Sequence, residues 1–145
     1  MTPKEVLMEF ETSRTAPVGA MRAALDAREE MLPAFLAEIE RAMTTPWEEL
    51  PYADSYSIIF LILGEWGDPR SYLPLTRLLR LDEDTLDDLL GDTLTDDSDR
   101  VLANVATDDL RPIFDLILDR DVYLFVRTCM ISALLRIAIE HPERR

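Results

Sequence analysis

The chain is 145 residues long, 48% hydrophobic and 30% charged, with a formal net charge of −14. This length fits a single domain over residues 1–145, and the hydrophobic share is enough for a buried core without disulfide or metal staples. The charge disfavours nucleic acids and anionic membrane surfaces as partners, because both would be repelled. It would attract a basic or metal-bearing partner, but keeping the protein soluble and monomeric is by itself a sufficient explanation of the acidity.

No segment of the sequence is typical of an exported or membrane-inserted protein. Residues 1–10 carry acidic side chains early, unlike a signal peptide. The longest apolar run, residues 58–63, is far shorter than the roughly 20 residues that a membrane-spanning helix needs. Because Cys129 is the only cysteine, no intramolecular disulfide can form. We therefore expect a cytoplasmic protein that spans no membrane.

Apolar residues follow helical spacing in the first third of the chain. Thr2 is suited to cap a short first helix that Pro3 opens. A second helix is expected around residues 21–28, and residues 32–43 form the clearest amphipathic helix, which Leu32 and Pro33 begin.

The same spacing continues to the C-terminus. Asp54 is expected to cap a helix over residues 56–63 that is apolar nearly all round, which is typical of a helix sandwiched between neighbours. Further helix starts are expected at Pro69, at Asp84, at Ser98 and at position 108 or 109, and the last helix covers residues 123–139. With about nine helices and no sustained alternation of the strand type, the chain is predicted to be all-α.

Three prolines in early helical turns indicate an internal repeat. Pro33, Pro74 and Pro112 each precede a similar apolar face, and they are 41 and 38 residues apart. Helix-pair repeats of the HEAT and armadillo kind have periods of about 40–47 residues. A proline that bends equivalent helices favours a curved stack. We therefore predict a HEAT-like α-α superhelix, a right-handed helical-repeat solenoid.

Two segments resemble HEAT repeats more specifically. Asp68 and Pro69 lie in a Gly-Asp-Pro corner of the kind that joins two helix pairs, and Asp121 and Arg127 match an inner turn and the helix after it. The resemblance implies that Arg127 pairs with the turn aspartate at position 119 or 121. An exposed arginine at a helix start is the alternative.

A closer similarity covers essentially the whole chain. Residues 86–97, 100–105, 24–29 and 125–127 resemble a bacterial family known as domain of unknown function 1186. The resemblance implies no activity. Some members carry a cysteine-rich, metal-binding SEC-C tail, but this sequence ends at Arg145 with a single cysteine, so we expect no zinc and no other cofactor.

Nine acidic residues and no basic residue lie between Asp82 and Asp99. Some of these acids suit helix starts or a solvated face, and the segment also suits a surface for a basic partner. A divalent-cation site is the third interpretation, although the spacing is not that of a calcium loop. The candidate interaction surface comprises Asp87, Asp88, Asp92, Asp96, Asp97 and Asp99.

The remaining chemistry-bearing residues do not indicate an enzyme. Cys129 lies in an apolar helix, His141 lies near the C-terminus without a positioned partner, and no hydrolase, phosphate-loop or zinc-protease motif occurs. We therefore expect a protein–protein interaction or scaffold module that uses an acidic repeat surface. The alternative is a metal-dependent factor or enzyme built on the acidic cluster of residues 87–99.

The last helix leaves hardly any polar face. Terminal repeats of a solenoid normally need a polar outer side. Either this helix lies inside the stack or it buries a face against another chain, which leads us to expect a homodimer formed through the C-terminal helix.

Overall fold

A computed structural model of the chain describes residues 1–140. Over these residues it contains nine α-helices, three short 3-10 helices and no strand, which confirms the predicted all-α fold. The α-helices are α1 (Pro3–Thr12), α2 (Val18–Asp26), α3 (Arg28–Thr44), α4 (Tyr56–Trp66), α5 (Tyr72–Leu78), α6 (Glu83–Leu90), α7 (Thr93–Val105), α8 (Arg111–Leu118) and α9 (Leu124–Glu140). The 3-10 helices are Trp47–Glu49, Ala53–Ser55 and Pro69–Ser71.

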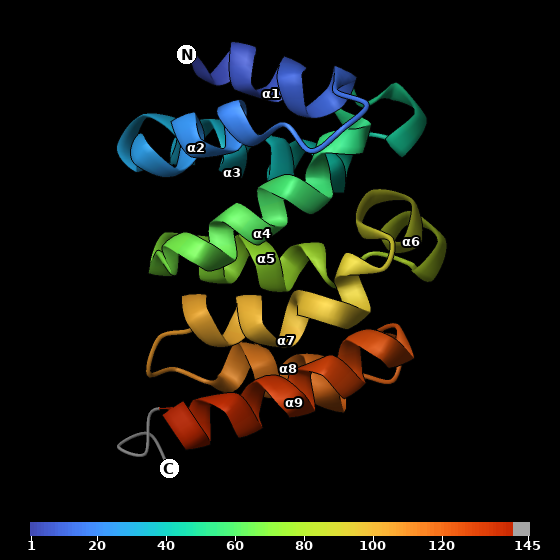
Figure 1. The fold of residues 1–145 in the computed structure, drawn as a ribbon. Coiled ribbons are helices and arrows are strands. Elements are labelled where there is room, and N and C mark those ends of the chain that lie inside the picture. The colour runs from blue at the N-terminus through green and yellow to red at the C-terminus, as the bar shows by residue number, and fades with distance from the viewer. Residues whose placement is uncertain (141–145) are drawn as a thin grey trace.

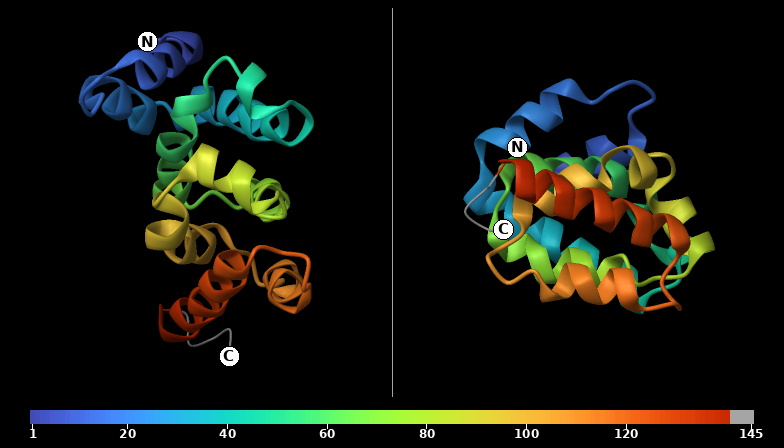
Figure 2. Two further views of the ribbon diagram at one scale, coloured as in Figure 1. Left: turned by 90° about the vertical axis from the view of Figure 1, so that its right-hand side faces the viewer. Right: turned by 90° about the horizontal axis from the view of Figure 1, so that it is seen from below.

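The helices stack in two layers, as a helical solenoid does (Figures 1 and 2). One layer contains α2, α4, α7 and α9, and the other contains α3, α5 and α8. The most extensive helix packing within the first layer joins α4 to α7 and α7 to α9. Helix α1 covers the N-terminal end, whereas α6 leaves both layers and lies to one side, against α4 and α7.

Polar contacts between neighbouring repeats show the predicted period. Four ion pairs join residues that are 37 to 41 positions apart in the sequence. Each of them therefore links similar positions in successive repeats, close to the 41- and 38-residue spacing of the prolines. The four pairs are Glu29–Arg70, Glu40–Arg77, Arg80–Asp119 and Asp99–Arg136.

Two of the three repeat prolines lie where they were predicted. Pro74 and Pro112 are in the first turns of α5 and α8. Pro33 instead lies inside α3, because that helix begins at Arg28 and not at Leu32. The acidic residues at positions 29 and 30 occupy its first turn, where the helix dipole favours negative charge.

Other predicted helix starts are partly correct. The Thr2 hydroxyl accepts the backbone N–H of Glu5 at 3.2 Å and caps α1, as predicted. Asp82 and not Asp84 caps α6, because its carboxylate accepts the backbone N–H of Thr85 at 3.1 Å. Asp54 does not cap α4, which follows directly from a 3-10 turn that ends at position 55.

Ser98 does not start a helix. It is fully buried in the middle of α7, which begins at Thr93. Leu94 and Val101 lie on the same face of α7 on either side of Ser98, and both are buried. The buried face of α7 therefore runs through the position where Ser98 was expected to cap a helix start.

Helix α4 is enclosed on most sides, as predicted. Tyr56, Ile59, Phe60, Ile62 and Leu63 are all buried. No helix in residues 1–140 combines the length and the apolar character needed to cross a membrane.

Candidate functional site

Three of the nine acids between positions 82 and 99 are used within the fold. Asp82 caps α6. Asp97 pairs with Arg100 at 3.2 Å, and Asp99 pairs with Arg136 of α9 at 2.8 Å. The other six acids are exposed: Glu83, Asp84, Asp87, Asp88, Asp92 and Asp96.

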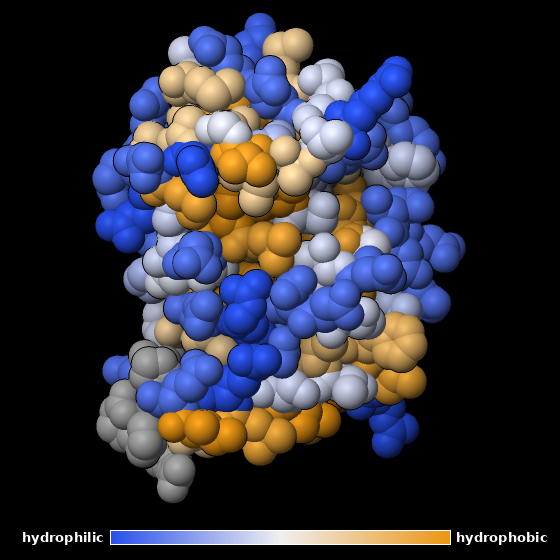
Figure 3. Space-filling view, in the orientation of Figure 1, coloured by the Kyte–Doolittle hydropathy of each residue, from blue (hydrophilic) through white to orange (hydrophobic). Residues whose placement is uncertain are grey.

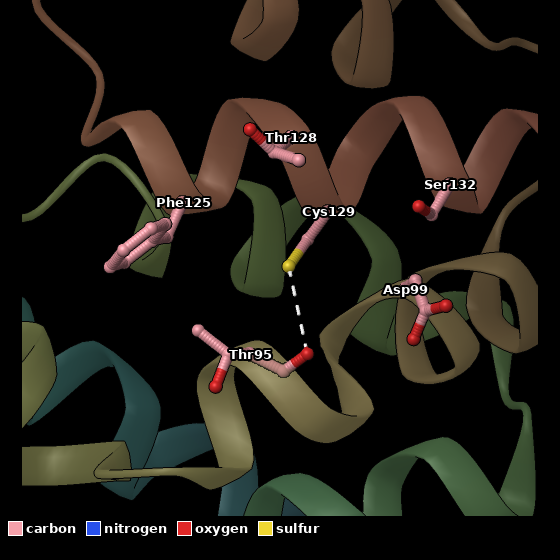
Figure 4. A pocket seen from close by; sticks show the side chains of 6 residues that line it. All are labelled: Thr95, Asp99, Phe125, Thr128, Cys129 and Ser132. Atoms are coloured by element: carbon pink, nitrogen blue, oxygen red, sulfur yellow. Dashed lines mark hydrogen bonds between the residues drawn. The ribbon is translucent and has the colours of Figure 1, made fainter.

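Three adjoining hollows lie where the N-terminal half of α9 meets α6 and α7, with volumes of about 310, 470 and 560 Å³. The first is lined by Thr95, Asp99, Phe125, Thr128, Cys129 and Ser132 (Figure 4). The second is lined by Asp82, Glu83, Asp121, Tyr123, Leu124 and Phe125. The third is lined by Asp87, Gly91, Asp92, Thr95, Tyr123 and Phe125. Because Phe125 lines all three, the hollows adjoin one another, and we call the three together the acidic groove.

The charged side chains that line the acidic groove are all negative among residues 1–140, and no lysine or arginine of that range lines it. The six lining carboxylates are Asp82, Glu83, Asp87, Asp92, Asp99 and Asp121. Of the predicted interaction surface, Asp87, Asp92 and Asp99 therefore belong to the groove. Asp88, Asp96 and Asp97 are not among the residues that line these three hollows.

The base of the groove is aromatic. Phe125 is 50% exposed, and its ring centroid lies 5.2 Å from that of Tyr123, with the rings tilted by 59°. Burial by neighbouring groups raises the pKa of the Tyr123 hydroxyl, and the charges of Asp87 and Glu83 raise it further. The tyrosine therefore lies within the field of the acids of α6.

Sequence reasoning did not identify Tyr123 and Phe125 as site residues. It treated both as part of the apolar last helix. The signal was the aromatic pair at the helix start, but only the fold shows that this start lies opposite α6 and α7.

Cys129 projects into the first hollow from α9 (Figure 4). Its thiol donates to the backbone carbonyl of Leu94 at 3.6 Å, with that of Thr95 at 4.0 Å. Burial raises the pKa of the thiol, with a further contribution from the Asp99 charge. Since the thiolate is the nucleophilic form, this environment does not activate Cys129. His141 lies outside the described residues.

The metal-site interpretation has no matching geometry. Within residues 1–140, no group of three or more histidine, cysteine, aspartate or glutamate side chains is arranged to hold a metal ion. The groove acids are spread along three hollows, and Asp82 and Asp99 already accept hydrogen bonds from within the fold.

The Gly-Asp-Pro corner joins two repeats. Asp68 accepts the backbone N–H of Arg70 at 2.9 Å and pairs with its guanidinium at 2.8 Å. The same guanidinium reaches Glu29 of α3 at 2.9 Å. Pro69, the first residue of the 3-10 helix, lacks an N–H that would otherwise need a partner there.

The pairing that the HEAT resemblance implied for Arg127 is wrong. Its Nε donates to the backbone carbonyl of Ile117 at 2.9 Å, at the C-terminal end of α8. Asp119 pairs with Arg80 of the preceding repeat instead, and Asp121 is exposed in the groove. Arg127 therefore closes a helix end, because unpaired carbonyls at a helix C-terminus attract cationic donors.

Comparison with known proteins supports the family resemblance. A protein family of unknown function, DUF1186, has a family model that matches residues 1–143. No curated protein and no solved structure matches the chain. Because the match covers nearly the whole sequence, the chain belongs to the DUF1186 family of proteins of unknown function.

Proposed function

We propose that this protein is a protein-binding helical-repeat module whose acidic groove docks a basic segment of a partner. The observation that carries the proposal is the groove itself, which six carboxylates, the aromatic rings of Tyr123 and Phe125, and no basic side chain of the described residues line. Solenoids commonly bind partners along extended surfaces of this kind.

The chemistry of the groove favours lysine and arginine side chains. Their cationic heads are attracted by the carboxylates, and arginine also stacks on aromatic faces such as that of Phe125. Their aliphatic stems can cover Leu124, which is 64% exposed. Phosphate-bearing ligands are disfavoured by the same charge.

The small energy of each single contact indicates that the ligand is an extended basic segment and not a single cation. An exposed ion pair contributes about 0.2–1 kcal/mol and an exposed cation–π contact about 0.5–1 kcal/mol. Micromolar binding requires about 8 kcal/mol. Several cationic side chains must therefore bind together, and the three adjoining hollows supply separate places for them.

The test uses a fluorescent peptide of alternating lysine, arginine and glycine residues, with its binding followed by fluorescence anisotropy. The double variant Asp87→Asn, Asp92→Asn removes two exposed groove charges. The matched control Glu5→Gln, Glu9→Gln removes two exposed charges from α1, at the other end of the stack. We expect the groove variant to bind about tenfold more weakly and the control to change by less than about twofold. An equal loss in both variants would mean non-specific attraction to net charge and would refute the proposal.

Phe125→Ala tests the groove without changing any charge. Because Phe125 is half exposed, its truncation should leave the fold intact, as checked by thermal unfolding. We expect peptide binding to weaken by about three- to tenfold through loss of the aromatic contact. Unchanged binding would show that the peptide lies elsewhere.

The natural partner can then be sought by affinity capture from cell lysate at low and moderate salt. A protein retained by the wild type and by the α1 control, but lost with both groove variants, would be the partner that the proposal describes.

A further inference from the structure

The outward side of α9 is a continuous apolar stripe. Leu124, Ile131, Leu135 and Ile139 are 64%, 50%, 60% and 73% exposed, and Thr128 occupies the one remaining position. Steps of four and three residues place all five positions on one helix face. Figure 3 shows this face as a hydrophobic band along the lower edge of the molecule, where α9 forms the end of the stack.

The stripe is the side that inner helices of the same layer bury. Helix α4 packs on α7, and α7 packs on α9. Among the described residues, no further helix covers the outward side of α9. The stripe is therefore a stacking surface without a neighbour in the described part of the chain.

The exposed apolar area of the stripe comes close to the area that a dimer buries. Taking roughly 170 Å² for a full aliphatic residue, the four α9 residues expose about 400 Å². A standard homodimer interface buries about 800 Å² per protomer, of which about 65%, or roughly 500 Å², is apolar. The stripe therefore supplies most of the apolar area that a homodimer of standard size needs.

Charge distinguishes a second copy from a basic partner. The stripe contains no charged residue, in a chain with a net charge of −14. A basic partner is attracted to the acidic groove, whose lining shares only Leu124 and Thr128 with the stripe. Two copies of this chain repel each other at most surfaces, but an uncharged apolar stripe lets them associate through burial alone.

We propose that the stripe is a self-association surface on which a second copy docks its own α9 in antiparallel orientation. A two-fold axis near Ile131 places Leu124 opposite Ile139 of the second copy, Thr128 opposite Leu135, and Ile131 opposite itself. The register is self-complementary, as a closed two-fold interface requires. The inference rests on different observations from the proposed binding function, and the two surfaces share only Leu124 and Thr128.

Sedimentation velocity over a range of protein concentrations tests the surface. The wild type should sediment as a dimer, and Leu135→Glu should shift it to monomer by weakening association at least about tenfold. Leu73→Glu is the matched control, because Leu73 is 54% exposed on α5 and lies outside the stripe. The control should remain a dimer. The proposal would be overturned if the wild type stayed monomeric at protein concentrations of hundreds of micromolar, which is on the order of the Kd of weak specific complexes. It would also be overturned if the Leu135→Glu variant remained a dimer.

Cysteine cross-linking tests the register in a Cys129→Ser background. Two copies of Ile131→Cys should form a disulfide-linked dimer on mild oxidation, because they meet at the axis. Two copies of Leu124→Cys would lie about 20 Å apart in the antiparallel arrangement, far beyond the roughly 7 Å limit for a disulfide. Cross-linking of Leu124→Cys in preference to Ile131→Cys would refute the antiparallel register.

Discussion

Neighbouring aspartates in residues 82–99 perform different tasks, and their surroundings decide which. Asp82 satisfies a helix start, and Asp99 pairs with Arg136, which is 37 positions away. Asp87 and Asp92 line the acidic groove instead. A carboxylate whose charge is paired inside the fold contributes less to a partner's attraction than an exposed one, which is why the groove test above changes only Asp87 and Asp92.

Asp68 gives a pH-dependent contribution to stability. It is 8% exposed, and its hydrogen bonds to the Arg70 side chain lower its pKa to about 2 from the ordinary 3.8. Because the folded-state pKa is depressed, the stabilisation is present above about pH 4 and is lost as the pH falls toward about 2. Asp68→Asn should lower the free energy of unfolding by about 1–2 kcal/mol at neutral pH, and by less in acid.

Urea unfolding of the wild type and of Asp68→Asn, at neutral pH and in acid, measures the difference in free energy of unfolding between the two proteins. A difference that persists undiminished in acid would mean that the charge of Asp68 is not the cause.

Cys129 should react slowly with thiol reagents. Its pKa is raised by burial, so the thiolate is scarcer at a given pH than in an exposed cysteine. The alkylation rate in the native protein should therefore lie below that of the urea-unfolded chain. A plot of alkylation rate against pH should also rise at a higher pH for the native protein than for the unfolded chain. Alkylation quenched at fixed times and measured by mass spectrometry checks both expectations. A native rate that equals or exceeds the unfolded rate would contradict the inert role assigned to this cysteine.

At the scale of elements, the contact between α4 and α7 depends on a glycine. A Cβ added at Gly64 would lie 2.6 Å from Cγ2 and 3.1 Å from Cα of Val101. The carbonyl of Gly64 also accepts the side-chain amide of Asn104 at 3.2 Å. The two helices therefore approach closely at this point, where a side chain would force them apart.

Gly64→Ala should lower the free energy of unfolding by about 1–3 kcal/mol through overpacking, in spite of alanine's higher helix propensity. Gly19→Ala in α2 is the control, because its added Cβ would meet nothing within 4 Å. That change should be neutral or stabilise by up to about 1 kcal/mol. Thermal and urea unfolding of both variants measures the contrast, and a Gly64→Ala variant as stable as Gly19→Ala would rule out the close contact.

At the scale of the whole molecule, the two proposed surfaces should respond to salt in opposite ways. Binding of a basic peptide to the acidic groove should weaken as salt rises, because opposite charges are screened. Self-association through the α9 stripe should stay constant or strengthen, because screening reduces repulsion between two chains of charge −14. Fluorescence anisotropy measures peptide binding and sedimentation velocity measures self-association, each at low salt and at about 0.15 M salt. Parallel trends would show that one surface is wrongly assigned.

The repeat architecture followed from local properties of the sequence. Apolar spacing marked the helices, and the spacing of Pro74 and Pro112 set a period that the ion pairs between repeats match. The boundaries at Ser98 and Leu32 were wrong because serine and proline occur both at helix starts and within helices. Local patterns do not separate these cases.

An acidic, all-helical repeat fold and an acid-rich segment over residues 82–99 were predictable from the sequence alone. Which acids share a groove depends on helix packing, because α6 leaves the stack and brings Asp87 opposite Tyr123 and Phe125. Helix packing also decided that Arg127 binds the carbonyl of Ile117 and not a turn aspartate. These contacts join positions on different helices, so they depend on how the helices pack, whereas helix periodicity is set by neighbours three and four residues away.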